Sequence, residues 1–168
     1  MTKHTPIDVN ITPAVDVRGE VFLFYSAANP VTAAYLNKYG DLDFCEQHGR
    51  KALEGIARIT FRLLSTRLRI GADKHAVTLR FDADHPDENI DIQSAPPKGK
   101  DCDTPLDHPR KNRLPHKPES FKDFASTSRQ LSFSDENKDH KEYKYTLYVL
   151  TGIPDKSRLR FDPRIKNQ

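Results

Sequence analysis

The stretch RITFRLLSTRLRIGADKHAVTLRF, residues 58–81, decides between two folds. A helical period would continue the preceding segment, residues 46–57, into one long basic helix. In such a helix Ile59 and Phe61 would point about 200° apart, so the apolar side chains would spread around its surface. A period of two instead places the apolar residues of 58–63 and of 77–81 on one side, alternating with arginine and threonine. We therefore expect two strands here, each with one face on a core.

Other segments of the chain also predict strands. The residues Arg18-Gly19 indicate a turn between a strand over 7–17 and a strand over 20–28. Within the second, FLFY at 22–25 is apolar at every position, which predicts a central strand. We expect 130–134 and 142–150 to form a hairpin around a charged loop. Two further short strands are expected, over 89–93 and 157–161.

One helix has clear end signals. In NPVTAAYLNKYG, Asn29 suits the N-cap, Pro30 the first helical position and Gly40 the residue after the last turn. These signals predict a helix over 30–39, and 50–56 has the composition for two more turns. The expected fold class is mainly β, at the margin of α+β. We predict a β-sandwich of short, mostly antiparallel strands with one or two short helices, in a single domain over 1–168.

The bulk composition limits the function classes. Of the 168 residues, 36% are hydrophobic and 30% are charged, and the net charge is only +3. Such a balance argues against a dedicated nucleic-acid-binding protein, whose basic excess is normally large. The start of the chain has no apolar run of the kind found in signal peptides, and no segment approaches the ~18 apolar residues of a membrane span. We expect a soluble, cytoplasmic protein with reduced cysteines and no membrane association.

A long loop over 96–118 is the most conspicuous segment without strand or helix patterning. It holds six of the twelve prolines and almost nothing to bury, so we expect it to be exposed. Basic clusters of this length bind phosphate backbones or acidic protein surfaces, although the plain alternative is a solvated loop. Its candidate partner-binding residues are Arg110, Lys111, Arg113 and Lys117.

The strand arginines form a second candidate surface. Arg58, Arg62 and Arg80 are expected on outer strand faces, next to Thr60 and Thr78. A platform for single-stranded nucleic acid would also need base-stacking aromatic residues on that face, and the pattern places none there. We therefore interpret these arginines as contacts to a partner or as an ordinary solvated face.

Two patterns suggest metal ligands. Cys45 and His48 are three residues apart, and together with Cys102 and His108 (His116 lies nearby) they supply the ligand types that zinc prefers. However, Cys102, His108 and His116 include no closely spaced pair, which favours free thiols and exposed histidines.

The loop oxygens of Asp135, Asn137, Asp139 and Glu142 follow the spacing of a calcium loop. His140 and Thr146 stand where that loop needs glycine and glutamate. A hairpin tip without calcium is therefore the favoured interpretation of this loop. The acidic stretch with Asp82, Asp84, Asp87 and Glu88 is interpreted in the same way, as a turn without a metal, and we predict no cofactor.

No catalytic motif is present. The sequence contains no G-x-S-x-G, no glycine-rich phosphate loop and no H-E-x-x-H, so catalytic residues remain unassigned. The leading hypothesis is a non-enzymatic interaction module that contacts another protein, or a second copy of itself, through the 96–118 loop and the arginine face. The alternatives are a metal-dependent hydrolase or nuclease and a nucleic-acid-binding protein.

Overall fold

A computed structural model describes residues 2–94, 118–139, 141–153, 158–161 and 163–167. Its first sheet has the order β2-β1-β4-β9-β8. Its strands are β1 His4–Val15, β2 Val21–Ala27, β4 Ile56–Leu63, β8 Phe121–Ser126 and β9 Gln130–Asp135. In the second sheet β7 pairs with β10, and the remaining order is β11-β10-β12-β3. Its strands are β3 Leu42–Asp43, β7 Ile90–Ser94, β10 Glu142–Leu150, β11 Arg158–Phe161 and β12 Arg164–Lys166.

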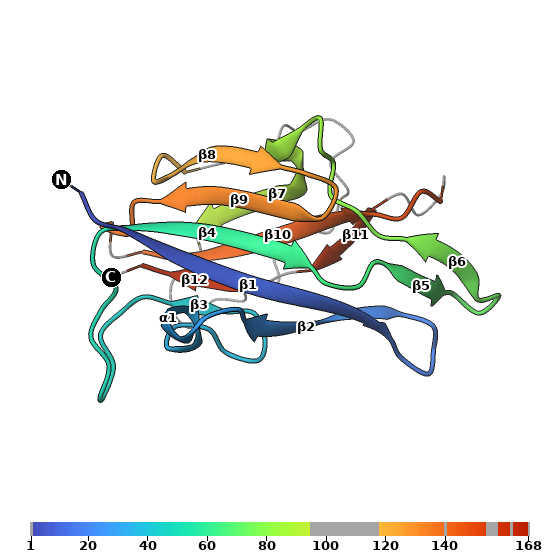
Figure 1. Cartoon of the computed structure of the whole chain (residues 1–168), viewed down its shortest axis with the longest axis horizontal. Coiled ribbons are helices and arrows are strands. Elements are labelled where there is room, and N and C mark those ends of the chain that lie inside the picture. Colours follow the sequence, from blue (N-terminus) through green and yellow to red (C-terminus); the bar gives the residue numbers. More distant parts are fainter. Residues whose placement is uncertain (1, 95–117, 140, 154–157, 162, 168) are drawn as a thin grey trace.

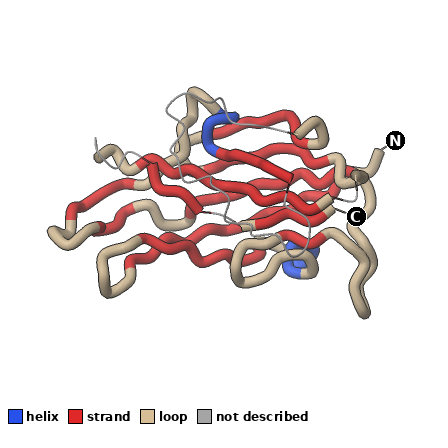
Figure 2. Tube along the Cα trace, turned by 180° about the vertical axis from the view of Figure 1, so that it is seen from behind, coloured by secondary structure: helices blue, strands red, loops and turns tan. Residues whose placement is uncertain are grey.

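The two larger sheets lie in two layers, which Figure 1 shows from the side of the first sheet and Figure 2 from behind. Aromatic rings join the layers: Phe61 of β4 lies 5.5 Å from Tyr145 of β10, and Phe121 of β8 lies 4.9 Å from Tyr143, measured between ring centroids. A small hairpin of β5 Arg67–Ile70 and β6 His75–Thr78 forms the third sheet. The prediction of a mainly β chain is confirmed. The β-sandwich remains our interpretation of this layering.

The alternation that decided residues 58–63 is confirmed in β4. Ile59 and Phe61 are fully buried, whereas Arg62 is exposed. β4 lies parallel to β1 and antiparallel to β9. The second expected strand, 77–81, is only partly formed, because β6 ends at Thr78 and Arg80 makes an isolated bridge to Leu150.

The predicted helix over 30–39 is wrong in length. Helix α1 spans only Pro30–Ala33, although Asn29 caps it as expected by accepting a hydrogen bond from the backbone of Thr32. The Thr32 hydroxyl accepts a bond from the backbone N–H of Asp8 in β1, which fixes α1 against the sheet. The chain then turns, and Leu36 bridges to Leu42. No helix forms over 50–56; the other helical segment of the described chain is the 3-10 helix η1 Pro86–Asn89.

Two pairing predictions are also wrong. β2 is an edge strand of the first sheet and not a central one, so Phe22 and Phe24 are exposed. β9 and β10 do not form a hairpin, because β9 pairs with β4 and β8 while β10 belongs to the second sheet. The segment between them therefore connects the two layers. Sequence patterning also missed β3, β5, β8 and β12.

Both ends of the described chain lie at the same end of the molecule (Figure 1). Among the described residues, no helix has the length and apolar character needed to cross a membrane. The 96–118 loop lies outside the described residues except for Pro118.

Candidate functional site

The first candidate site is the outer face of the first sheet, the side that points away from the second sheet. Strand register defines it: Phe22 and Phe24 of β2 lie opposite Ala14 and Thr12 of β1, and Asn10 of β1 lies beside Arg62 of β4. The intervening residues of β1 and β4 point into the core. Beyond β4, the strand β9 adds Gln130, Ser132 and Ser134 to this face.

An aromatic pair stands at the β2 edge of the outer face. The residues Phe22 and Phe24 are 38% and 57% exposed, and their rings meet edge to face with centroids 5.0 Å apart. The sequence suggested that this face lacks aromatic residues, because alternation was not recognised in an all-apolar run. β2 in fact alternates, with Leu23 and Tyr25 packed against the core and the two phenylalanines outward.

The two arginines of β4 differ in their availability. The Arg58 guanidinium donates to the hydroxyls of Ser134 and Ser132 at 3.0 Å and 3.3 Å, and to the carbonyl of Asp123 at 3.2 Å. These bonds hold Arg58 flat on the sheet. Arg62 is exposed and makes one long bond of 3.5 Å to Gln130 Oε1. Arg62 is therefore the better placed to contact a partner.

The remaining predicted partner contacts do not lie on the outer face. Arg80 exchanges two backbone hydrogen bonds with Leu150 at the end of β10, so it belongs with the second sheet. The loop residues lie outside the described chain: Arg110, Lys111, Arg113 and Lys117.

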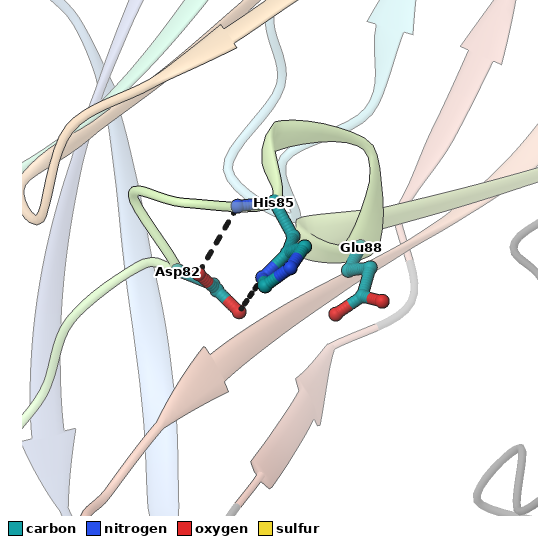
Figure 3. A group of neighbouring side chains, drawn as sticks. All are labelled: Asp82, His85 and Glu88. Atoms are coloured by element: carbon teal, nitrogen blue, oxygen red, sulfur yellow. Dashed lines mark hydrogen bonds and ion pairs between the residues drawn. The ribbon is translucent and has the colours of Figure 1, made fainter.

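The second candidate site is the acidic turn that precedes β7. Asp82, His85 and Glu88 bring a ring nitrogen and carboxylate oxygens within 4.8 Å of one another (Figure 3). Asp82 accepts hydrogen bonds from the backbone N–H groups of Asp84 and His85, and its Oδ2 lies 3.2 Å from His85 Nδ1. Buried Asn89 supports the turn through bonds to both backbone groups of Asp82.

The charges of the acidic turn already have partners. Burial raises the pKa of Asp82, but the hydrogen bonds from Asp84 and His85 outweigh burial and hold that pKa below its usual range. The same carboxylate raises the pKa of His85. Arg158 of β11 lies 3.3 Å from the Glu88 carboxylate. A nitrogen with two carboxylates is a ligand set that zinc or manganese accepts. It is nevertheless a partly exposed cluster whose charges already have partners, and such clusters are common without a metal.

Of the cysteine and histidine set, the structure describes only Cys45 and His48. Cys45 is half-buried, and its thiol donates to the carbonyl of Asn167 at 3.2 Å. Burial, followed by the charge of Asp43, raises the pKa of this thiol, which disfavours the thiolate that zinc needs. His48 is exposed in the loop after Cys45. Cys102, His108 and His116 lie outside the described residues.

The third candidate site is a polar corner where β9, β10 and the residue after β12 meet. Asn167 Nδ2 donates to Asp135 Oδ1 and to Asp139 Oδ1, at 3.1 Å each. Asp139 also accepts bonds from the hydroxyls of Ser120 and Tyr143. Burial raises the pKa of Asp139, but these hydrogen bonds outweigh burial and hold it below its usual range. Burial raises the pKa of Asp135 to about 7.

The polar corner brings together two of the four residues that follow the spacing of a calcium loop. Asp135 and Asp139 come together, whereas the side-chain amide of Asn137 donates to the carbonyl of Leu53 and Glu142 is exposed. The residue that joins the two aspartates, Asn167, is 28 positions from Asp139 and was missed. A single asparagine near the end of a chain gives no local signal. A surface pocket of about 380 Å³ adjoins the corner and is lined in part by Ser120, Asp139 and Tyr143.

Comparison with known proteins adds no assignment. No protein-family model matches the chain, and no curated protein is similar to it in sequence. The candidate sites are therefore judged on their geometry.

Proposed function

We propose that this chain is a non-enzymatic interaction module that binds another protein through the outer face of its first sheet. The observation that carries the proposal is the exposed pair Phe22 and Phe24, which stands on the same face as Arg62. Aromatic residues and arginine are the types enriched in the centres of protein interfaces. Asn10, Thr12 and Ser26 lie beside the rings on this face and are half-buried or exposed, which suits the polar rim of such an interface.

Energetics support contact through the two rings. Fully burying a phenylalanine side chain that was exposed stabilises a complex by about 1.5–3 kcal/mol before the costs of association. Two adjacent rings therefore supply a useful share of the affinity of a transient complex. Because the rings already contact each other, they lose less rotational freedom on binding than isolated exposed side chains would.

The 96–118 loop remains part of the proposal on sequence grounds alone. Its basic residues would contact the same partner or a second region of it. A partner with an acidic surface would suit both this loop and Arg62.

A second candidate function is binding of single-stranded nucleic acid. The specific observation in its favour is that aromatic rings do share the face with Arg62, contrary to the expectation from sequence. Stacking of bases on aromatic rings contributes about 1–3 kcal/mol per base. The near-balanced charge and the engagement of Arg58 with Ser132 and Ser134 make a phosphate-binding groove the weaker interpretation.

Site-specific photo-crosslinking tests the proposal. A photoreactive phenylalanine analogue is placed at Phe24, and in a control chain at Tyr39, an equally exposed aromatic residue in the turn before β3. After irradiation in an extract of the source cell, we expect discrete protein adducts from position 24 that position 39 does not form. Equal adduct patterns from both positions would contradict the proposal. Adducts that disappear after nuclease treatment would favour the nucleic-acid candidate instead.

A further inference from the structure

Among the residues that the structure describes, two buried oxygen atoms of the polar corner find no hydrogen-bond partner. They are Asp135 Oδ2 and Asn167 Oδ1, on side chains that are fully or almost fully buried. The two side chains are already joined by the bond from Asn167 Nδ2 to Asp135 Oδ1. Buried polar atoms are nearly always satisfied, so two orphaned acceptors on one bonded pair need a common explanation.

A carboxylic acid and a primary amide form a ring of two hydrogen bonds. The amide N–H donates to one carboxyl oxygen, and the acid O–H donates to the amide oxygen. The first bond is present in the structure. The second bond would join the two orphaned atoms and requires a proton on Asp135 Oδ2.

We propose that Asp135 is protonated in the folded chain and closes this ring with Asn167, so that one proton fastens the C-terminal end of the chain to β9. Asn167 connects this proton to other parts of the fold through backbone hydrogen bonds. Its backbone N–H donates to the carbonyl of Lys141 at 2.9 Å, and its neighbour Lys166 accepts a bond from the N–H of Phe44. Loss of the proton leaves a buried charge whose free oxygen faces the amide oxygen, which weakens these attachments.

The charges around Asp135 favour the neutral form. Burial is the main cause that raises its pKa to about 7, and the carboxylates of Asp139 and Glu136 act in the same direction. Hydrogen bonds to Asp135 from the backbone N–H of Asn137 and from the Asn167 amide act in the opposite direction but do not outweigh burial. The nearby lysines Lys122 and Lys138 pair with Glu136 and do not reach Asp135. Other described titratable groups near the corner include Tyr143, bonded to Asp139, and Cys45, bonded to the carbonyl of Asn167. Lys141 is an exposed residue that contacts the corner through its backbone, by bonds to Asp139 and Asn167.

Because the pKa of Asp135 is raised in the folded chain, this carboxyl makes the folded chain less stable as the pH rises. A carboxyl whose pKa is higher in the folded chain than in the unfolded chain stabilises the fold fully below the unfolded pKa. That stability is lost as the pH rises from the ordinary value of 3.8 to about 7. Above about 7 both states are deprotonated and no further change occurs.

Amide hydrogen exchange between about pH 4 and about pH 9 tests the proposal, read at the amides of Asn167 and Phe44 after correction for intrinsic exchange. We expect their opening constant to increase by up to about tenfold per pH unit up to about pH 7 and then to level off. In Asp135→Asn, the new side-chain amide can form the same two hydrogen bonds with the Asn167 amide and has no titrating proton. We therefore expect the opening constant of this variant not to change with pH. Asp84→Asn, which removes an exposed carboxyl, keeps the wild-type profile.

Three results would overturn the proposal. One is the same exchange profile for the wild type and Asp135→Asn. A second is a carbon-13 titration in which the Asp135 carboxyl has its ordinary pKa. The third is restored protection at high pH on addition of calcium, which would show that the two oxygens hold a cation and not a proton. The proposal is independent of the outer face and survives the failure of the proposed function.

Discussion

Phe22 and Phe24 of β2 meet edge to face on the outer face of the first sheet, with their ring planes inclined by 72°. The residues between and after them, Leu23 and Tyr25, pack against the core. β2 is therefore apolar on both sides: one side stabilises the fold, and the other exposes two rings to solvent. Edge strands usually carry charges or proline that discourage association, and Val21–Ala27 contains neither.

Substitution of the outward rings should leave stability nearly unchanged. We expect Phe24→Ser to change the free energy of unfolding by less than about 1 kcal/mol, because surface substitutions away from special features have small effects. Phe61→Ala, which empties a fully buried ring position between the two sheets, should cost about 3–5 kcal/mol. Urea unfolding of both variants checks this difference. A large loss in Phe24→Ser would mean that its ring is structural.

The glycine before β4 should be much less tolerant of substitution than a glycine in the preceding loop. Gly55 and Gly49 both have positive φ angles, +80° and +77°. A Cβ at Gly55 would lie 2.3 Å from the carbonyl oxygen of Lys3, whereas at Gly49 it would meet nothing within 4 Å. We expect Gly49→Ala to cost about 1 kcal/mol, from backbone strain alone, and Gly55→Ala clearly more. Similar melting temperatures for the two variants would contradict the close approach of Lys3, the residue before β1, to this turn.

The acidic turn should depend on its buried asparagine. Asn89 accepts a bond from the backbone N–H of Asp82 at 2.7 Å and donates to its carbonyl at 2.8 Å. Asn89→Ala leaves these groups without that partner in a buried place, so we expect a loss of about 2 kcal/mol in the free energy of unfolding. Asn37→Ala, which removes comparable bonds from an exposed turn, should cost less than half as much. Equal losses in the free energy of unfolding of the two variants would contradict the expectation that burial makes the bonds of Asn89 more important for stability.

Cys45 should react slowly with thiol reagents. Its pKa is raised, first by burial and then by Asp43, so less of the reactive thiolate is present at neutral pH than for an ordinary cysteine. In a Cys102→Ser background, which leaves one thiol, the labelling rate with a disulfide reagent should still be rising at pH values above 9.0, the ordinary pKa. A rate that levels off below that value would show an activated thiol and would reopen the metal hypothesis.

Local patterning predicted the strands whose two faces differ. In β4 the apolar residues Ile59 and Phe61 alternate with polar ones, because one side of the strand faces the core and the other carries Arg58, Thr60 and Arg62. In β2 both sides are apolar, so the same rule indicated a central strand for what is an edge. The N-cap at Asn29 was read correctly, but a cap fixes where a helix begins and not where it ends. The bond between Thr32 and Asp8, which involves β1, has no signature near the helix.

Pairing between distant segments explains the remaining errors. The polar loop between 130–134 and 142–150 is compatible with a hairpin and with a connection that crosses between the two sheets. No local sequence feature distinguishes these two connections. The polar corner is a similar case. Asp135 and Asp139 were recognised as a pair of loop carboxylates, but their arrangement depends on Asn167, which reaches them only after β12 pairs with β10.

Comparative affinity capture tests the central claim most directly. The wild type, the double variant Phe22→Ser/Phe24→Ser and the control Tyr39→Ser are immobilised at equal density, and the proteins retained from an extract of the source cell are quantified by mass spectrometry. The account predicts at least one protein that the wild type and Tyr39→Ser retain and that the double variant loses at least tenfold, consistent with about 1.4 kcal/mol or more of binding free energy from the two rings. Retention of the same proteins in the same amounts by all three chains would contradict it.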